Sequence, residues 1–97
     1  MLRNYETMYI VKPTLDDEAV ETVTKKFDDQ IAGIGGTVEK TEKRGRKRLA
    51  YEVKDFKDGF YVLTDFQADP AQIKELERLI KLNDDVIRHV IVRKDEA

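Results

Sequence analysis

The chain has 97 residues, of which 40% are hydrophobic and 39% are charged, and its formal net charge is −2. A chain of this length builds one hydrophobic core, so we expect a single domain over residues 1–97 with a strongly charged surface. It contains no cysteine, which excludes disulfides and thiolate metal sites and fits a reducing cytoplasm. No apolar run approaches the roughly 20 residues that cross a bilayer, and no signal-peptide pattern opens the chain, so we expect no membrane partner.

The first third of the chain predicts a strand followed by a helix. Residues 4–12, NYETMYIVK, are rich in β-branched and aromatic types and end before Pro13, which is typical of a strand. Both of its faces carry apolar residues, so we expect cover on both. Residues 16–18 then place three carboxylates where a helix N-terminus attracts negative charge. An apolar stripe at helical spacing follows and ends before Gly35-Gly36: Val20, Val23, Phe27, Ile31 and Ile34.

The middle of the chain predicts a hairpin of two antiparallel strands. Residues 37–53 form one long strand, in which Gly45 indicates a bulge or a bend. The segment KDFKDG, residues 54–59, carries the turn dipeptide Asp58-Gly59. FYVLTDF, residues 60–66, then forms the third strand.

The last third predicts a second helix and a final strand. Asp69-Pro70-Ala71-Gln72 has the pattern of a capping box with proline at the first helical position. A buried stripe of Ile73, Leu76, Leu79 and Ile80 follows, and VIRHVIV, residues 86–92, forms the last strand. The order β-α-β-β-α-β predicts an α+β, ferredoxin-like fold, a four-stranded antiparallel sheet with two helices on one face.

This topology leaves the second face of the sheet without helices. Alternation places six apolar residues of three strands on that face: Met8, Ile10, Tyr61, Leu63, Val90 and Val92. An apolar surface of that size on a small domain marks a contact site. The alternative is that these are scattered apolar surface residues, which need no partner.

Residue patterns for catalysis or cofactor binding are missing from the sequence. The single histidine, His89, cannot build a metal site alone, and we expect it to be a partly buried structural residue. The glycines at 33, 35 and 36 match no phosphate-binding loop, and no nucleophile elbow occurs. We therefore expect no enzymatic activity, no metal, no cofactor and no small-molecule substrate.

The basic segment KRGRKRLAY, residues 43–51, has three interpretations. Residues 40–54 contain seven basic and two acidic side chains, so they carry +5 while the rest of the chain carries −7. Such a cluster supplies the phosphate-directed charge that dominates nucleic-acid affinity. It could instead be a solvated edge strand, in which lysines discourage aggregation. A targeting tag is disfavoured, because the segment leads directly into strand residues.

Three segments carry a further pattern. The chain opens with RNYE before an apolar strand and a proline, continues with GRKRLAYEV at 45–53, and ends with LNDDVIRHVIVRK at 82–94. Together they resemble the bacterial small-subunit ribosomal protein six family, over about residues 3 to 94.

The resemblance implies a structural, non-enzymatic protein of the small ribosomal subunit in the cytoplasm, with a role in translation. It implies binding to the central domain of small-subunit ribosomal RNA together with ribosomal protein eighteen. In that family the partner protein covers the open sheet face, which here holds the six apolar residues named above, and basic side chains at the rim touch RNA. Carried onto this sequence, the RNA contacts are Arg3, Arg46, Lys47, Arg48, Lys54, Arg88 and Arg93.

Two other functions fit the same topology. A small-ligand regulatory domain would pair with a second copy and carry a glycine-rich ligand loop, and the sequence offers neither pattern clearly. An acylphosphatase-like enzyme would need an anion-cradling loop after the first strand, where this chain has Lys12-Pro13-Thr14-Leu15.

Overall fold

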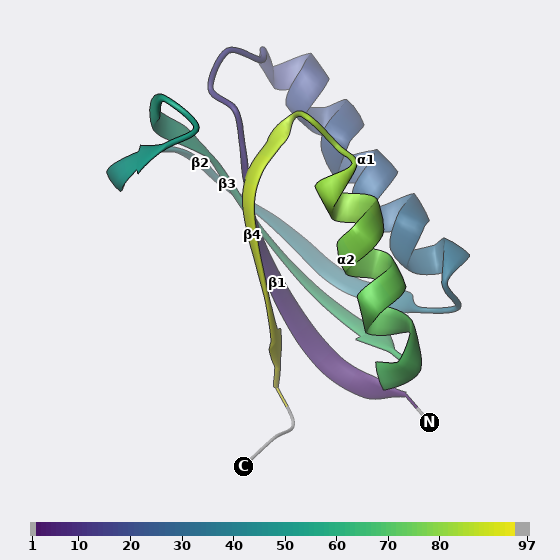
Figure 1. The fold of residues 1–97 in the computed structure, drawn as a ribbon. Helices are drawn as coiled ribbons and strands as arrows, with labels where there is room; N and C mark the ends of the chain where they lie inside the picture. The colour runs from purple at the N-terminus through teal and green to yellow at the C-terminus, as the bar shows by residue number, and fades with distance from the viewer. Residues whose placement is uncertain (1, 95–97) are drawn as a thin grey trace.

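The computed structural model describes residues 2–94; residue 1 and residues 95–97, at the two ends of the predicted domain, lie outside it. The elements are β1 (Arg3–Val11), α1 (Asp17–Gly33), β2 (Thr37–Val53), β3 (Phe56–Ala68), a 3-10 turn (Pro70–Gln72), α2 (Ile73–Lys81) and β4 (Val86–Arg93). The strands form one antiparallel sheet in the order β2-β3-β1-β4, and both helices cover the same face (Figure 1). The predicted ferredoxin-like fold is confirmed.

Local chemistry determines where α1 begins and ends. The Asp16 carboxylate accepts a hydrogen bond from the Ala19 backbone N–H at 2.8 Å, which satisfies one of the free donors of the first turn. At the other end, Gly35 adopts a φ of 84°, and the Gly36 N–H donates to the Ile31 carbonyl at 2.9 Å. A left-handed residue that closes the last turn is the usual helix stop, so the predicted end at Gly35-Gly36 is confirmed.

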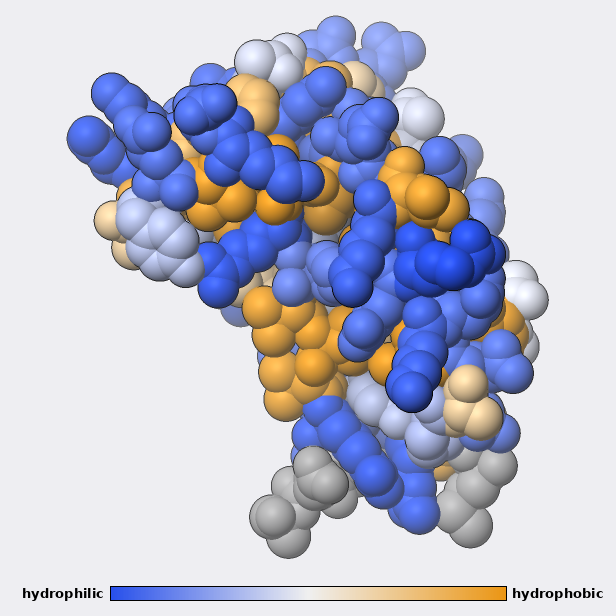
Figure 2. Space-filling view, in the orientation of Figure 1, coloured by the Kyte–Doolittle hydropathy of each residue, from blue (hydrophilic) through white to orange (hydrophobic). Residues whose placement is uncertain are grey.

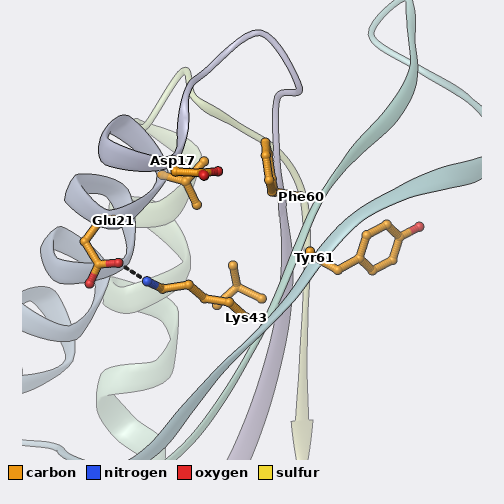
Figure 3. Close-up of a pocket in the computed structure, with 8 residues that line it drawn as sticks. Asp17, Glu21, Lys43, Phe60 and Tyr61 are labelled. Carbon is orange, nitrogen blue, oxygen red and sulfur yellow. Dashed lines mark hydrogen bonds and ion pairs between the residues drawn. The ribbon is translucent and has the colours of Figure 1, made fainter.

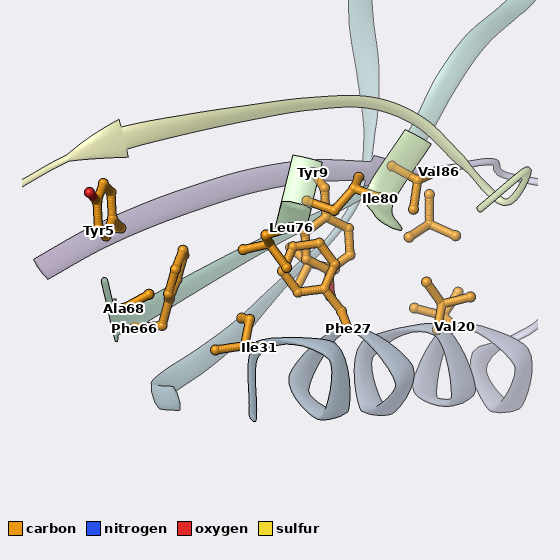
Figure 4. Packing of buried hydrophobic residues seen from close by; sticks show 13 residues of the cluster. Tyr5, Tyr9, Val20, Phe27, Ile31, Phe66, Ala68, Leu76, Ile80 and Val86 are labelled. Atoms are coloured by element: carbon orange, nitrogen blue, oxygen red, sulfur yellow. The ribbon is translucent and has the colours of Figure 1, made fainter. Parts of the chain in front are cut away.

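The main core lies between the two helices and the sheet. Tyr9, two residues before the end of β1, is fully buried and stacks on Phe27 of α1 with ring centroids 4.4 Å apart. Leu76 and Ile80 of α2 pack into the same core beside these rings (Figure 4). Stacked aromatic pairs contribute about 0.5–1.5 kcal/mol beyond their buried area. The central strand is therefore the element on which both helices depend.

A second, smaller core lies on the opposite face of the sheet. The last β1–β3 pair joins Val11 to Phe60, so the far part of the β2–β3 hairpin extends beyond β1. There Leu49 packs on Ile10 and Ile87. Ile87 reaches this face because the β1–β4 register shifts by one residue between Ile10 and Val11. The far part of the hairpin thus covers part of the face that has no helices.

The turn of the hairpin differs from the prediction. It lies at Lys54-Asp55, whose φ values of 50° and 70° give the tight turn that two-residue hairpins favour, and not at Asp58-Gly59. Gly59 is instead a residue of β3, at a point where its backbone lies close to Ile10 and Val11 of β1. A Cβ on Gly59 would lie 2.4 Å from Ile10 Cγ2, so the glycine serves packing.

The start of α2 also differs from the prediction. The Asp69 carboxylate does cap the chain, since it accepts from the Ala71 N–H at 2.9 Å, but the residues it caps form a 3-10 turn. The α-helix proper begins at Ile73, with no side-chain cap from Gln72. The predicted reciprocal capping box is therefore only half formed.

Gly59→Ala should lower the free energy of unfolding by about 1–3 kcal/mol, because the new methyl group overpacks the contact with Ile10 and the Val11 carbonyl. The matched control is Gly33→Ala at the end of α1, where an added Cβ meets nothing within 4 Å. It should leave the stability unchanged or raise it by up to about 1 kcal/mol. Urea denaturation of both variants measures the difference, and equal losses would contradict this role of Gly59.

Candidate nucleic-acid interface

Four basic side chains meet at the far part of the β2–β3 hairpin. Arg46, Lys47 and Arg48 are exposed on the edge strand β2, and Lys57 joins them from β3. Together with Asp58 they line a groove of about 400 Å³. No pattern in the sequence singles out Lys57, because its place beside Arg48 follows only from the register that pairs Arg48 with Asp58.

Two of these cations are held over aromatic rings. The Arg46 guanidinium lies 5.0 Å from the centre of the Phe60 ring, and its Nη2 donates to the Pro13 carbonyl at 2.9 Å. The Lys47 ammonium lies 6.0 Å from the Tyr61 ring. Because strand residues alternate, Arg46 turns toward the helix side and Lys47 toward the open face. The edge therefore presents cations on both sides of the sheet.

The basic run divides into a paired and an unpaired half. Lys43 reaches from β2 to the Glu21 carboxylate of α1, across a groove of about 340 Å³ (Figure 3). Arg44 Nε lies 3.2 Å from a carboxylate oxygen of Glu42. Within residues 2–94, by contrast, residues 46–48 have no carboxylate within ion-pair distance. Their charge is available to an external anion.

The remaining predicted RNA contacts fall into two groups. Arg88 lies near the hairpin, since its guanidinium stacks 5.5 Å from the Tyr51 ring and donates to the phenol oxygen. Lys54 occupies the turn itself. Arg3 and Arg93 lie at the opposite end of the sheet, where Arg3 pairs with Ala68 and Arg93 with Tyr5. The structure thus brings five of the seven predicted residues to one end.

The six predicted partner residues share the face opposite the helices. The register places Met8 between Leu63 of β3 and Val90 of β4. Val90 and Val92 keep 39% and 52% of their surface exposed, and Figure 2 shows apolar surface over the lower half of β4. Ile10 differs from the expectation, because Leu49 and Ile87 bury it to 3% exposure. The part of this face that stays uncovered is therefore its lower half in Figure 1, around Val90 and Val92.

His89 lies on the helix side of β4 and is partly buried, as predicted. Burial lowers its pKa, the Lys81 ammonium adds to that effect, and the Glu77 carboxylate opposes it. Between residues 2 and 94 no group of three or more His, Cys, Asp or Glu side chains is arranged to hold a metal ion. None of the helices in that range has the length and apolar composition needed to cross a bilayer.

Comparison with known proteins identifies the family. The family model described as ribosomal protein S6 matches residues 4–93. The chain belongs to the ribosomal protein S6 family. The small ribosomal subunit protein bS6 of Desulforamulus reducens is 46% identical over 95 residues, 98% of this chain and 100% of that protein. That of Heliobacterium modesticaldum is 47% identical over 95 residues, 98% and 99% of the two chains.

A solved structure shows the same fold. The crystal structure of 30S ribosomal protein S6 from Thermotoga maritima matches with a TM-score of 0.91 and 29% sequence identity, over 97% of this chain and 89% of that one. This member of the S6 family is therefore a structural protein of the small ribosomal subunit, in the cytoplasmic ribosome, as the sequence resemblance implied.

Stability of the chain should depend on the protonation of His89. The folded state has the lower His89 pKa, so the unfolded state, near the ordinary value of 6.5, binds the proton more tightly. Stability should then be full above that value and fall as the pH drops from 6.5 through the folded pKa. His89→Gln should flatten this part of the profile, which urea denaturation at about pH 7.5 and about pH 5.5 measures. An unchanged pH slope in the variant would contradict the assignment.

Proposed function

We propose that this chain binds the central domain of small-subunit ribosomal RNA through the hairpin end and ribosomal protein eighteen through the open sheet face. The observation that carries the RNA part is the unpaired charge of Arg46, Lys47 and Arg48 beside Lys57, on an edge strand that no other strand covers. Phosphate contacts dominate nucleic-acid affinity, and arginine grips phosphate through a planar fork.

The hairpin end is suited to the RNA backbone, and its exposed aromatic ring, Tyr51, is engaged by the Arg88 guanidinium. Its groove is lined by cations and Asp58, with no aromatic ring among the lining residues. The rings of Phe60 and Tyr61 lie under Arg46 and Lys47. Contacts of this kind position a protein on folded RNA without specifying sequence. The role is therefore assembly, with no chemical step.

The open face supports a protein partner. Val90 and Val92 expose apolar surface beside Met8 and Leu63 on the open face of the four-stranded sheet. Apolar surface of this kind gains free energy when a second protein removes it from water. The regulatory-domain alternative has less support, because membership of the ribosomal protein S6 family favours the structural role.

Arg46→Ala combined with Arg48→Ala should weaken binding to small-subunit ribosomal RNA. Each phosphate contact contributes about 0.7–0.9 to the slope of log affinity against log salt, so the slope should shrink by about 1.4–1.8. Filter binding over a salt series measures it. The control is Lys25→Ala combined with Lys26→Ala, two exposed cations of α1. Unchanged affinity and slope in the arginine variant would reject the site.

Val90→Ser combined with Val92→Ser should weaken binding to purified ribosomal protein eighteen by about tenfold or more, since each valine buried on binding contributes up to about 1.5–3 kcal/mol. Isothermal titration calorimetry measures the affinity. Leu82→Ser is the matched control, because Leu82 is 67% exposed but lies at the end of α2, in the helix layer. An equal loss of affinity in the control, or no loss in the valine double variant, would contradict binding of the partner at the open face.

A further inference from the structure

Glu6 occupies an unusual place on the open sheet face. It lies on the central strand β1, where the register sets it directly opposite Asp65 of β3 and Val92 of β4. Side chains directly opposite on adjacent antiparallel strands are close neighbours, and like charges in that position destabilise the sheet. Two carboxylates therefore face each other on the open face, beside the apolar side chains of Met8 and Val92.

The chain compensates the neighbouring carboxylates but leaves Glu6 without an ion pair. Asp65 forms an ion pair with Lys94, whose Nζ lies 3.5 Å from Asp65 Oδ1. Glu42 on β2 has two cations, with Arg44 Nε at 3.2 Å and Lys40 Nζ at 3.9 Å. Glu6 has no cation within ion-pair distance among residues 2–94. Its charge is tolerated in the free chain because the carboxylate, which is only partly buried, keeps contact with water.

Covering the open face would remove that water. On the same face, Met8, Val90 and Val92 offer no hydrogen bond from their side chains, and the nearby Gln67 amide donates to Asn4 Oδ1 at 3.1 Å. An ionised carboxylate that loses water and gains no cation is among the costliest groups to bury. A protein that covers the valines must therefore bring positive charge to this point, or it would bind poorly.

We propose that the segment covering the open face is basic and sets an arginine against Glu6. The inference rests on the proposed function of this face and specifies the chemistry of its partner. A guanidinium has donors in a planar fork and can bond both carboxylates at once, which a lysine ammonium does less well. RNA is disfavoured here, because its phosphates would meet the carboxylates of Glu6 and Asp65.

Glu6→Gln tests this chemistry, since it keeps the shape of the side chain and removes the charge. Its affinity for purified ribosomal protein eighteen, measured by calorimetry, should fall by about 30-fold or more, as expected when one member of a buried charged pair is lost. The Tm of the free variant should stay the same or rise, because the repulsion from Asp65 is gone. Glu77→Gln makes the same change on α2, in the helix layer, and should leave the affinity unchanged.

The outcomes separate this inference from the proposed function. Weaker binding of Glu6→Gln with an undiminished Tm supports the inference, whereas weaker binding with a lowered Tm overturns it, because a structural loss would then explain the result. Undiminished binding of Glu6→Gln while the Val90 and Val92 double variant loses affinity overturns only the inference. If neither variant loses affinity, the proposed partner face fails as well.

Discussion

The side chain of Leu49 packs on Ile10 and Ile87, and both candidate surfaces depend on this contact. The hairpin beyond the Val11–Phe60 pair extends past β1, so this small core holds its far part against the sheet. Burying a leucine contributes about 1.5–3 kcal/mol, enough to fix the course of the far part of the hairpin. The same contact sets the cations of β2 at one end of the molecule and confines the free apolar surface to the other half of the open face.

Charge pairing then distinguishes the two surfaces. Lys43 and Arg44 are neutralised by carboxylates of the chain itself, whereas the next three cations of β2 have no such partner among residues 2–94. On the open face the arrangement is reversed, because Glu6 is the carboxylate without an ion pair in the described part of the chain. An anionic partner is thus favoured at the hairpin end and a cationic one at the lower half of the sheet, since complementary charge governs which surfaces associate. The proposed RNA and protein partners would therefore use separate surfaces of one small fold.

Alternation and helical spacing predicted most of the fold, because both depend on neighbours close in sequence. Tyr9 and Val11 point to the helices and Met8 to the open face, as their positions in the strand require. Asp58-Gly59 was misleading, because the dipeptide is typical of a turn while the structure uses Gly59 for its close approach to Ile10. Lys57 and the burial of Ile10 were missed for a related reason. Each depends on how the hairpin folds back, which no local pattern encodes.

The sequence alone determined the element order, the face of the β1 and β3 residues and the concentration of positive charge between residues 40 and 54. These are consequences of spacing and composition, which do not change with the course of the chain. Only the tertiary structure decided which of those charges are free. Glu21 of α1 pairs with Lys43 of β2, and Glu42 pairs with Arg44 along β2. It also placed Glu6 opposite Asp65, since the register between β1 and β3 joins residues far apart in sequence. Ion pairing and register are properties of distance in space, and these select the surfaces that a partner can use.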